Sequence, residues 1–254
     1  MIGGYIICLK AGYIKILGVD FFNGTLTDSL VKAKNSLVVA PSGPGLASDL
    51  IKNKFYKESL ENADIVLPDS GLMCFLLNWI MGKRIKRLSG LKFLKKFLSD
   101  FDSFESSFWI MPNVEQGKSN IKWINDNYRF KISDDQVYIA PYYNRSSPVD
   151  DPALLLKIQK LKPTTIFIQL GGGIQEQLGL FLKRNLNYRS SILCTGAAIA
   201  FLSREQSPIP DWVDKFYMGW MVRCLYNPKV FVPRYLAAFK LVYLLLKYGG
   251  RSPS

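Results

Sequence analysis

The chain has 254 residues, of which 48% are hydrophobic, and these values suit one globular domain of ordinary size and argue against disorder. Its net charge of +13 at pH 7 calls for an acidic partner: nucleic acid, anionic lipid or a phosphorylated ligand. Histidine is absent. This excludes Ser-His-Asp and Cys-His nucleophile systems and histidine-based metal sites, and leaves Asp, Glu, Lys, Tyr and Arg as candidate catalysts.

Short apolar runs alternate with amphipathic segments from about residue 14 to residue 204, which predicts strands and helices in turn. The runs expected to form strands are Ile14–Val19, Leu37–Ala40, Ile65–Leu67, Phe108–Met111, Val137–Ala140, Thr165–Leu170 and Ile192–Thr195. The segments with helical spacing are Thr27–Lys34, Leu46–Asn62, Leu72–Met81, Leu91–Phe101, Ser119–Asn127, Pro152–Leu161 and Gln175–Asn185. The predicted fold class is α/β, a Rossmann-like and mostly parallel sheet with helices on both faces.

The most informative run ends in an acid, because Ile65–Leu67 and Pro68 lead directly into Asp69, Ser70 and Gly71. Ligands of parallel α/β sheets sit beyond the carboxyl ends of the strands, so a carboxylate there is placed to meet a substrate. Asp69 is therefore the candidate catalytic residue. The alternative is that Asp69 merely caps the helix expected to begin near Gly71.

A glycine turn follows the run Thr165–Leu170, where Gly171, Gly172 and Gly173 precede Gln175 and Glu176. Backbone N–H groups at such a turn form an anion site for a phosphate at a helix N-terminus. A dinucleotide fingerprint would need glycine at position 176, so a dehydrogenase is disfavoured. The alternative is a glycine turn that only packs the helix on its strand.

The last part of the chain differs in composition. From Lys215 onward there are seven Lys or Arg residues and no acid, interleaved with aromatic residues. This pattern predicts a basic helical appendage that lies in a membrane interface, and the expected domains are residues 1–207 and 208–254. The alternative is a helical cap on the sheet. A second acid-free basic block suits anionic headgroups or a diphosphate, or is a solvated face; it comprises Lys83, Arg84, Lys86, Arg87, Lys92, Lys95 and Lys96.

The cysteines and the apolar segments of the sequence indicate the compartment of the protein and its relation to the membrane. The four cysteines lie far apart with no C-x-x-C pair, which indicates free thiols of a cytosolic protein. Residues 1–9 lack a basic start and a cleavage site, so a signal peptide is not expected. The longest apolar stretch, Tyr235 to Tyr248, contains Lys240 and is shorter than the ~20 residues that a spanning helix needs.

One pattern could hold a metal, because Asp100 and Asp102 form a D-x-D of the kind that carries Mg²⁺ or Mn²⁺ on a diphosphate. Here it follows a basic amphipathic helix and is flanked by serines, as in an ordinary surface turn. We expect no metal and no cofactor.

Three segments together resemble the TagA/WecG/CpsF glycosyltransferases. Residues 63–69 resemble the family segment "adlvlpDG", and residues 170–176 resemble "lGaPkQE". Trp220 and Arg223, followed by Pro228 and Arg234-Tyr235, are similar to "EW-x-x-R…P…RY". The resemblance extends over residues ~14 to 240, and the chain departs from the family pattern at Pro41, Gly43, Ser70, Gly173, Ala200 and Gly219.

The resemblance implies a metal-independent, inverting transfer of a sugar from a UDP-sugar to a polyprenyl-pyrophosphate-linked sugar acceptor, in cell-wall or surface polysaccharide synthesis. It implies a cytoplasmic protein held peripherally on the inner face of the cell membrane, on an anionic surface, and leaves a homo-oligomer open. Asp69 matches the family's proposed base and Arg223 the arginine of its C-terminal appendage, which makes both candidate catalytic residues. Arg87 matches the arginine that follows the aspartate motif, and Gln175 matches the nucleotide-sugar contact. The remaining substrate-binding candidates are Ser42, Ser70, Gly171, Gly172, Glu176 and Arg234.

Two other hypotheses stay open beside the enzyme. The departures from the family pattern suit a catalytically inactive relative that binds a nucleotide-sugar or lipid as a membrane-bound partner of an assembly complex. Nucleic-acid binding rests on charge alone and no recognised motif supports it, so no nucleic acid is expected.

Overall fold

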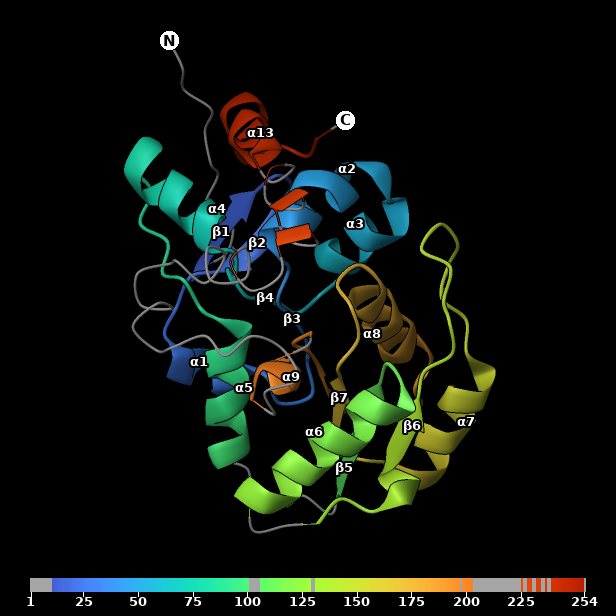
Figure 1. Cartoon of the computed structure of the whole chain (residues 1–254). Coiled ribbons are helices and arrows are strands. Elements are labelled where there is room, and N and C mark those ends of the chain that lie inside the picture. The colour runs from blue at the N-terminus through green and yellow to red at the C-terminus, as the bar shows by residue number, and fades with distance from the viewer. Residues whose placement is uncertain are drawn as a thin grey trace.

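The computed structural model of the chain describes residues 11–100, 106–128, 131–196, 198–202 and 239–253, together with Leu225, Pro228, Lys229, Val232, Pro233 and Leu236. In these residues one eight-stranded sheet runs through the molecule (Figure 1). Its strands are β1 (Tyr13–Ile16), β2 (Val19–Phe22), β3 (Leu37–Val39), β4 (Ile65–Val66), β5 (Ser107–Met111), β6 (Val137–Ile139), β7 (Thr165–Ile168) and β8 (Ser191–Cys194).

The strands follow the order β1-β2-β4-β3-β8-β7-β5-β6, and every neighbouring pair except β1 and β2 is parallel. Their side chains are almost all buried from β3 to β5 and in β7 and β8, as continuously apolar runs require when helices cover both faces. The predicted α/β class with a mostly parallel sheet is therefore confirmed.

Helices cover both faces. One face packs against η1 (Gly45–Asp49), α2 (Leu50–Lys52), α3 (Lys54–Glu61), α4 (Gly71–Phe75), η2 (Leu76–Ile80), α7 (Pro152–Leu161), α8 (Ile174–Asn185) and α13 (Lys240–Tyr248). The other packs against α1 (Leu26–Lys32), α5 (Gly90–Ser99), α6 (Val114–Asn127) and α9 (Ala198–Leu202). A short 3₁₀ turn, η4 (Asp134–Gln136), precedes β6. Each face has its own buried cluster, and the stacked rings of Trp109 and Phe167, 3.9 Å between centroids, lie in the second.

The helix expected over Pro152–Leu161 is confirmed at both ends. Asp151 accepts a hydrogen bond from the Leu154 N–H over 2.9 Å, Pro152 occupies the first turn, and Lys162 ends the helix with a φ of 47°. Elsewhere the boundaries differ. The helix expected over 46–62 breaks at Asn53, whose extended backbone and side chain cap α3. The helix expected from Ser119 begins at Val114 because Asn113 caps it.

The single strand expected over Ile14–Val19 is wrong, since the chain forms a hairpin there. Leu17 and Gly18 take φ values of 51° and 84°, which is the backbone of a tight I′ turn and reverses the chain between β1 and β2. The sequence carried a weak signal because the first turn position is an apolar Leu rather than Asn or Asp. The turn is tied to the C-terminal segment by Leu17 N–H to Gly249 O (2.8 Å) and Gly18 N–H to Gly250 O (3.2 Å).

The C-terminal helix α13 buries Leu241, Leu244 and Leu245 in the core of the first face. The boundary expected at residue 208 stays a prediction. Among the described residues no helix has the length and hydropathy to cross a bilayer. Cys74 and Cys194 are buried free thiols, as expected, whereas Cys8 and Cys224 lie outside the described residues.

Candidate active site

The site is built at the carboxyl edge of the sheet, where β4, β3, β8 and β7 are consecutive neighbours. β3 continues into η1 on one face, whereas β8 leads to α9 on the other. Such a switch between neighbouring parallel strands opens a crevice at their carboxyl ends, which is where α/β folds bind ligands. The segments after the four strands therefore supply the candidate site residues.

Asp69 lies at this edge, half-buried, three residues after the end of β4. Its Oδ1 accepts a hydrogen bond from the Gly90 N–H over 3.0 Å. Gly90 begins α5 above the ends of β3 and β8, since a Cβ on it would lie 3.0 Å from the Ala40 Cβ and 3.8 Å from the Thr195 carbonyl oxygen. The carboxylate is thus at the switch point, and within the described part of the chain its Oδ2 accepts no hydrogen bond.

The alternative in which Asp69 caps the next helix is wrong. Ser70 is the N-cap of α4, because its Oγ accepts the Met73 N–H over 3.2 Å. Asp69 instead meets the first N–H of α5, a helix that starts 21 residues later, where the partial positive charge of the helix N-terminus favours a carboxylate.

Arg87 joins Asp69 from the basic block. Its Nε donates to the Asp69 carbonyl oxygen over 2.9 Å, and Leu88 N–H reaches the Pro68 carbonyl over 3.3 Å. Burial raises the pKa of the nearby Cys74 thiol to about 12, while the Arg87 charge lowers it and the Asp69 charge raises it. One guanidinium and one carboxylate therefore share this corner of the sheet edge.

The turns after β3 and β4 also touch. A Cβ on Gly43 would lie 2.8 Å from the Ser70 Oγ, so these two turns are in close contact. Ser42 Oγ accepts the Gly45 N–H over 3.3 Å. The structure therefore brings the candidates Ser42, Ser70, Asp69 and Arg87 to one edge.

The glycine turn after β7 has two different halves. No atom of the described residues lies within 4 Å of a Cβ built on Gly172, and on Gly171 the only such neighbour is Arg145 Nη2 at 4.0 Å, so the turn is open there. Gly173 takes a φ of 94°, and its N–H donates to Glu176 Oε2 over 2.7 Å. The open half can admit an anion to backbone N–H groups, whereas the closed half is fixed by Glu176.

Gln175 is buried and links two loops. Its Oε1 accepts the Gly196 N–H over 2.7 Å, and its Nε2 donates to Glu176 Oε1 over 3.1 Å. The amide thus holds the turn after β7 against the turn after β8. A direct nucleotide contact by Gln175 stays a prediction, and it would use the second Nε2 hydrogen.

Glu176 is a fully buried carboxylate. Its pKa is raised to about 7, mainly by burial and to a smaller extent by the nearby Asp49, while the N–H groups of Glu176 and Gly173 and the Gln175 amide oppose the shift. Tyr56, from α3, is buried beside the same two acids, and burial first and then their charge raise its pKa well above the ordinary value. Glu176 is therefore an interior residue, near the partly buried Asp49, and does not line the open edge.

A hollow of about 300 Å³ adjoins the open glycines. It is lined by Pro112, Ala140, Pro141, Tyr142, Tyr143, Arg145, Leu170, Gly171 and Ile174. Tyr143 donates to Asp151 Oδ2 over 2.6 Å, and burial followed by this bond raises its pKa far above the ordinary value. The sequence-based prediction missed Tyr142, Tyr143 and Arg145. Their signal was available, because they follow the apolar run Val137–Ala140 and so had to reach the same edge.

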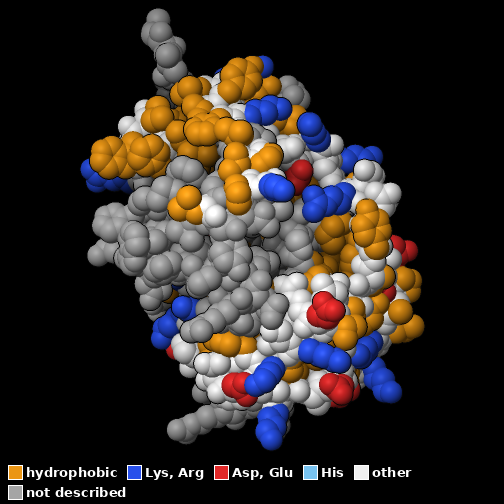
Figure 2. Space-filling view, viewed as in Figure 1, with side chains coloured by type: hydrophobic (Ala, Val, Ile, Leu, Met, Phe, Trp, Pro, Cys, Tyr) orange, Lys and Arg blue, Asp and Glu red, His pale blue; other side chains and the backbone are white. Residues whose placement is uncertain are grey.

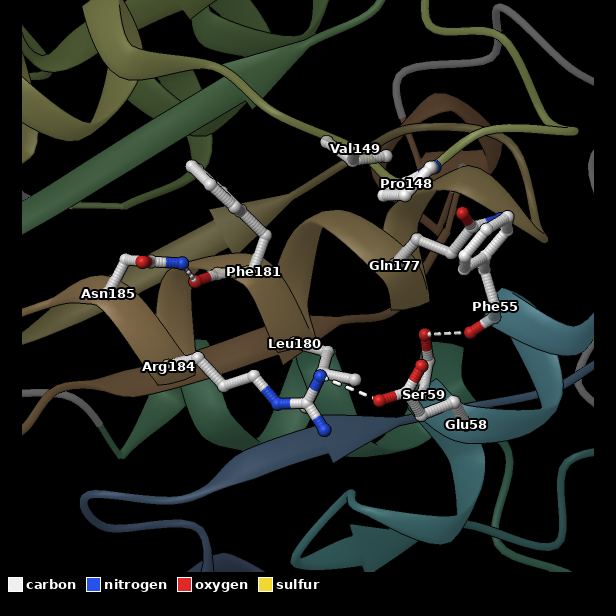
Figure 3. Close-up of a pocket in the computed structure, with 10 residues that line it drawn as sticks. All are labelled: Phe55, Glu58, Ser59, Pro148, Val149, Gln177, Leu180, Phe181, Arg184 and Asn185. Atoms are coloured by element: carbon white, nitrogen blue, oxygen red, sulfur yellow. Dashed lines mark hydrogen bonds and ion pairs between the residues drawn. The ribbon is translucent and has the colours of Figure 1, made fainter.

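A second cavity, of about 160 Å³, lies between α3 and α8 (Figure 3). Gln177 donates through Nε2 to the Gly173 carbonyl over 2.8 Å, while its buried Oε1 has no partner among the described residues. The Arg184–Glu58 ion pair, 2.7 Å, closes one side. None of the predicted site residues lines this cavity.

The described residues contain no group of three acids or cysteines that could hold a metal ion. Asp100 of the D-x-D instead pairs with Lys96 over 2.7 Å, and Asp102 lies outside the described residues. The candidates Arg223 and Arg234 also lie outside the described residues, as do Gly219, Trp220 and Tyr235 of the tail motif.

Comparison with known proteins agrees with the resemblance in the motifs. The chain is 22% identical over 223 residues to the N-acetylglucosaminyldiphosphoundecaprenol N-acetyl-beta-D-mannosaminyltransferase of Bacillus subtilis (strain 168), which covers 84% of this chain and 83% of that protein. It is 23% identical over 225 residues to the protein of the same name from Bacillus spizizenii (strain ATCC 23059 / NRRL B-14472 / W23), with coverage of 86% and 84%. The model of the glycosyl transferase WecG/TagA/CpsF family matches residues 14–253. The chain therefore belongs to the WecG/TagA/CpsF family and is a glycosyltransferase of the hexosyl-transferring kind.

Proposed function

We propose that this enzyme transfers a sugar from a UDP-sugar to N-acetylglucosamine linked to a polyprenyl diphosphate, with inversion at the anomeric carbon and Asp69 as the general base. The observation that carries the proposal is the position of Asp69 near the β3/β8 switch, where Oδ1 accepts the Gly90 N–H and Oδ2 accepts no hydrogen bond from the described residues. The acceptor class comes from the names of the two Bacillus relatives.

Asp69 suits the role of base because, in the described part of the chain, only one of its two carboxylate oxygens accepts a hydrogen bond. In an inverting transfer the acceptor hydroxyl oxygen forms a bond to the anomeric carbon while the bond from that carbon to the UDP oxygen breaks. The hydroxyl proton passes to Asp69 Oδ2, and UDP leaves with the bonding electron pair. The hydrogen bond from Gly90 holds the carboxylate in one orientation during this step.

Charge on the leaving diphosphate needs cationic compensation. Arg87 lies beside Asp69 and presents a planar guanidinium, which grips phosphate oxygens in pairs better than lysine does. Arg223 and Arg234 are assigned to the same diphosphate on the resemblance of the tail motif alone.

The donor is proposed to lie along the open half of the glycine turn. Gly171 and Gly172 leave room for backbone N–H groups to approach phosphate oxygens, and Arg145 adds a cation beside Gly171. The hollow of about 300 Å³ with Tyr142 and Tyr143 has the size and aromatic lining that suit a nucleobase. Ser42 and Ser70 are kept as substrate-binding candidates because the turns that carry them meet at the same edge.

A transfer assay tests the proposal. The purified chain is incubated with a panel of UDP-sugars and a short-chain polyprenyl diphosphate that carries N-acetylglucosamine, and the product anomer is read by NMR. We expect one donor to give a lengthened lipid with inverted anomeric configuration. UDP at 100 times its dissociation constant should also stabilise the fold by about 2.7 kcal/mol, measured as a melting shift.

The alternative, a catalytically inactive binding partner, predicts a different result. UDP or the lipid acceptor would then bind and raise the melting temperature while no donor of the panel is turned over. If neither UDP binding nor transfer is found, both the enzyme with this donor class and the inactive binder are rejected.

The proposal also includes a peripheral position on the cytoplasmic face of the membrane, where such a lipid acceptor resides.

A further inference from the structure

Helices α4 and η2 carry an unusual outer face. Their inner residues Met73, Cys74 and Leu77 are buried in the core, yet Phe75, Trp79 and Ile80 are 46%, 79% and 56% exposed. The rings of Phe75 and Trp79 stack on one another with 6.0 Å between centroids. Three large apolar side chains thus stand in solvent on ten consecutive helical residues.

A rigid basic loop follows directly. Lys83 N–H donates to the Leu77 carbonyl over 2.8 Å, and the Asn78 side chain makes two 2.9 Å hydrogen bonds with the backbone of Ile85. Asn23, from the β2 side, holds the Arg84 carbonyl and the Lys86 N–H, each over 3.1 Å. Lys83, Arg84 and Lys86 are therefore presented on a fixed backbone rather than on a free tail.

Trp79 and the basic loop line one groove. It has a volume of about 450 Å³ and is lined by Asn78, Trp79, Lys83, Arg84, Ile85 and Lys86. We call Phe75, Trp79, Ile80, Lys83, Arg84 and Lys86 together the α4 patch. No acid occurs in the chain between Asp69 and Asp100, so nothing in the local sequence neutralises these cations.

A second helix shows the same chemistry. On α13 the residues Phe239, Tyr243 and Leu246 are exposed, with Lys240 and Lys247 beside them, while the opposite side is buried. Figure 2 shows hydrophobic side chains gathered over α4 and α13 on the viewed face, with Lys and Arg among them. Both helices belong to the same face of the sheet.

We propose that the α4 patch docks the enzyme on an anionic lipid bilayer, with Phe75, Trp79 and Ile80 in the interface and Lys83, Arg84 and Lys86 on lipid phosphates. Aromatic side chains beside cations on an amphipathic helix are the composition that binds such interfaces. Because α4 starts two residues after Asp69 and the Arg87 Nε at the end of the loop donates to the Asp69 carbonyl oxygen, docking here holds the base near the lipid surface. That catalytic consequence rests on the proposed function, whereas docking itself does not.

The experiment is vesicle flotation with the full chain, because removing the tail would also remove α13 from the core. One variant combines Phe75→Ser and Trp79→Ser, and a second combines Lys83→Ala, Arg84→Ala and Lys86→Ala. The matched controls are Val31→Ser with Leu156→Ser, which are 74% and 69% exposed on other helices, and Lys32→Ala with Lys118→Ala and Lys160→Ala. The first control, like the first patch variant, replaces two exposed apolar side chains with serine. The second control, like the second patch variant, removes three positive charges.

We expect binding to phosphatidylglycerol vesicles to fall at least roughly tenfold in both patch variants, since one basic residue near an anionic surface contributes roughly fivefold. The controls should bind like the wild type, and the basic contribution should shrink in high salt. Brominated lipids should quench the fluorescence of the wild type more than that of Trp79→Phe. Patch variants that float like the wild type, or controls that lose as much, would overturn the proposal.

Two further measurements distinguish lipid docking from nucleic-acid binding and from catalysis. Salt-sensitive binding to duplex DNA that is lost in the triple lysine–arginine variant, with vesicle binding intact, would assign the loop to nucleic acid and overturn membrane docking. Transfer to a short-chain acceptor analogue in solution should be unchanged in the patch variants. If the wild type floats through the patch but transfers nothing, the proposed function fails while the docking surface stands.

Discussion

Asp64 and Asp69 stand at opposite ends of strand β4, and the fold uses their carboxylates very differently. Asp64 Oδ2 accepts the N–H of buried Leu37 over 2.7 Å, and Oδ1 pairs with Lys183 over 2.7 Å. Asp69 gives one oxygen to the Gly90 N–H and leaves the other without a hydrogen bond among the described residues. Both oxygens of Asp64 thus have structural partners, whereas among the described residues only one oxygen of Asp69 has one.

Asp69→Asn should have the largest effect. The amide oxygen can still accept the Gly90 N–H, so the fold and UDP binding should persist, but the side chain cannot accept the acceptor's proton. Turnover should fall by ~10²–10⁴ at saturating substrates. Asp64→Asn is the matched control and should retain transfer activity. A variant at position 69 that keeps more than about a tenth of wild-type turnover shows that Asp69 is not the base.

Glu176 extends the comparison to a carboxylate that is buried completely. Its pKa rises to about 7 from an ordinary value of 4.5, so the folded state keeps a proton that the unfolded state releases. The contribution of Glu176 to the free energy of unfolding is fully present below pH 4.5 and is lost as the pH rises through 7. The loss is at most roughly 1.4 kcal/mol per pH unit. We expect the urea midpoint of Glu176→Gln to change less between pH 5 and pH 7 than the midpoint of the wild type does. Glu61→Gln, at the exposed end of α3, corrects for net charge.

Asp64→Ala tests the structural end of β4. The change leaves the N–H of Leu37, a buried residue, without its acceptor, which costs about 1–3 kcal/mol of unfolding free energy. The ion pair with Lys183 adds little because both side chains are more than one third exposed. Urea unfolding measures the loss, and Asp64→Asn, which keeps an acceptor oxygen, should lose less. Equal losses in the two variants would contradict the role of the hydrogen bond.

What the sequence predicted well is local. Asp151, Pro152 and the residues after them carry the whole signal for α7, and the run Thr165–Ile168 needed only its continuous hydrophobicity to indicate a buried strand. The edge that receives Asp69 followed from the parallel pattern, because ligands of such sheets meet the carboxyl ends of strands.

What it could not predict depends on contacts between distant residues. Asp69 meets Gly90 across 21 residues, and Gln175 meets Gly196 across 21 residues, so neither partner is visible in a local window. The alternative in which Asp69 caps α4 was reasonable from its neighbours, yet Ser70 takes that position. Arg145 reaches Gly171 only because β6 and β7 lie on either side of β5 in the sheet.

Gly172→Val should give the smallest effect. It tests the proposed donor site at the glycine turn separately from the proposed base, Asp69. A Cβ at this position meets no atom of the described residues within 4 Å, so the added side chain should leave the melting temperature unchanged while it blocks the approach of phosphate to backbone N–H groups. We expect UDP affinity in calorimetry to fall about tenfold, which corresponds to ~1.4 kcal/mol, with the KM of the acceptor unchanged. Gly179→Ala, on the same helix that follows the turn, is the opposite case, because its Cβ would lie 2.7 Å from Cys194 Sγ and from Leu37 Cδ1 and should lower stability without altering UDP contacts. Unchanged UDP affinity in Gly172→Val would show that residues 171–176 form a purely structural turn. Asp69 and Arg87 would then be the part of the proposed site that remains supported.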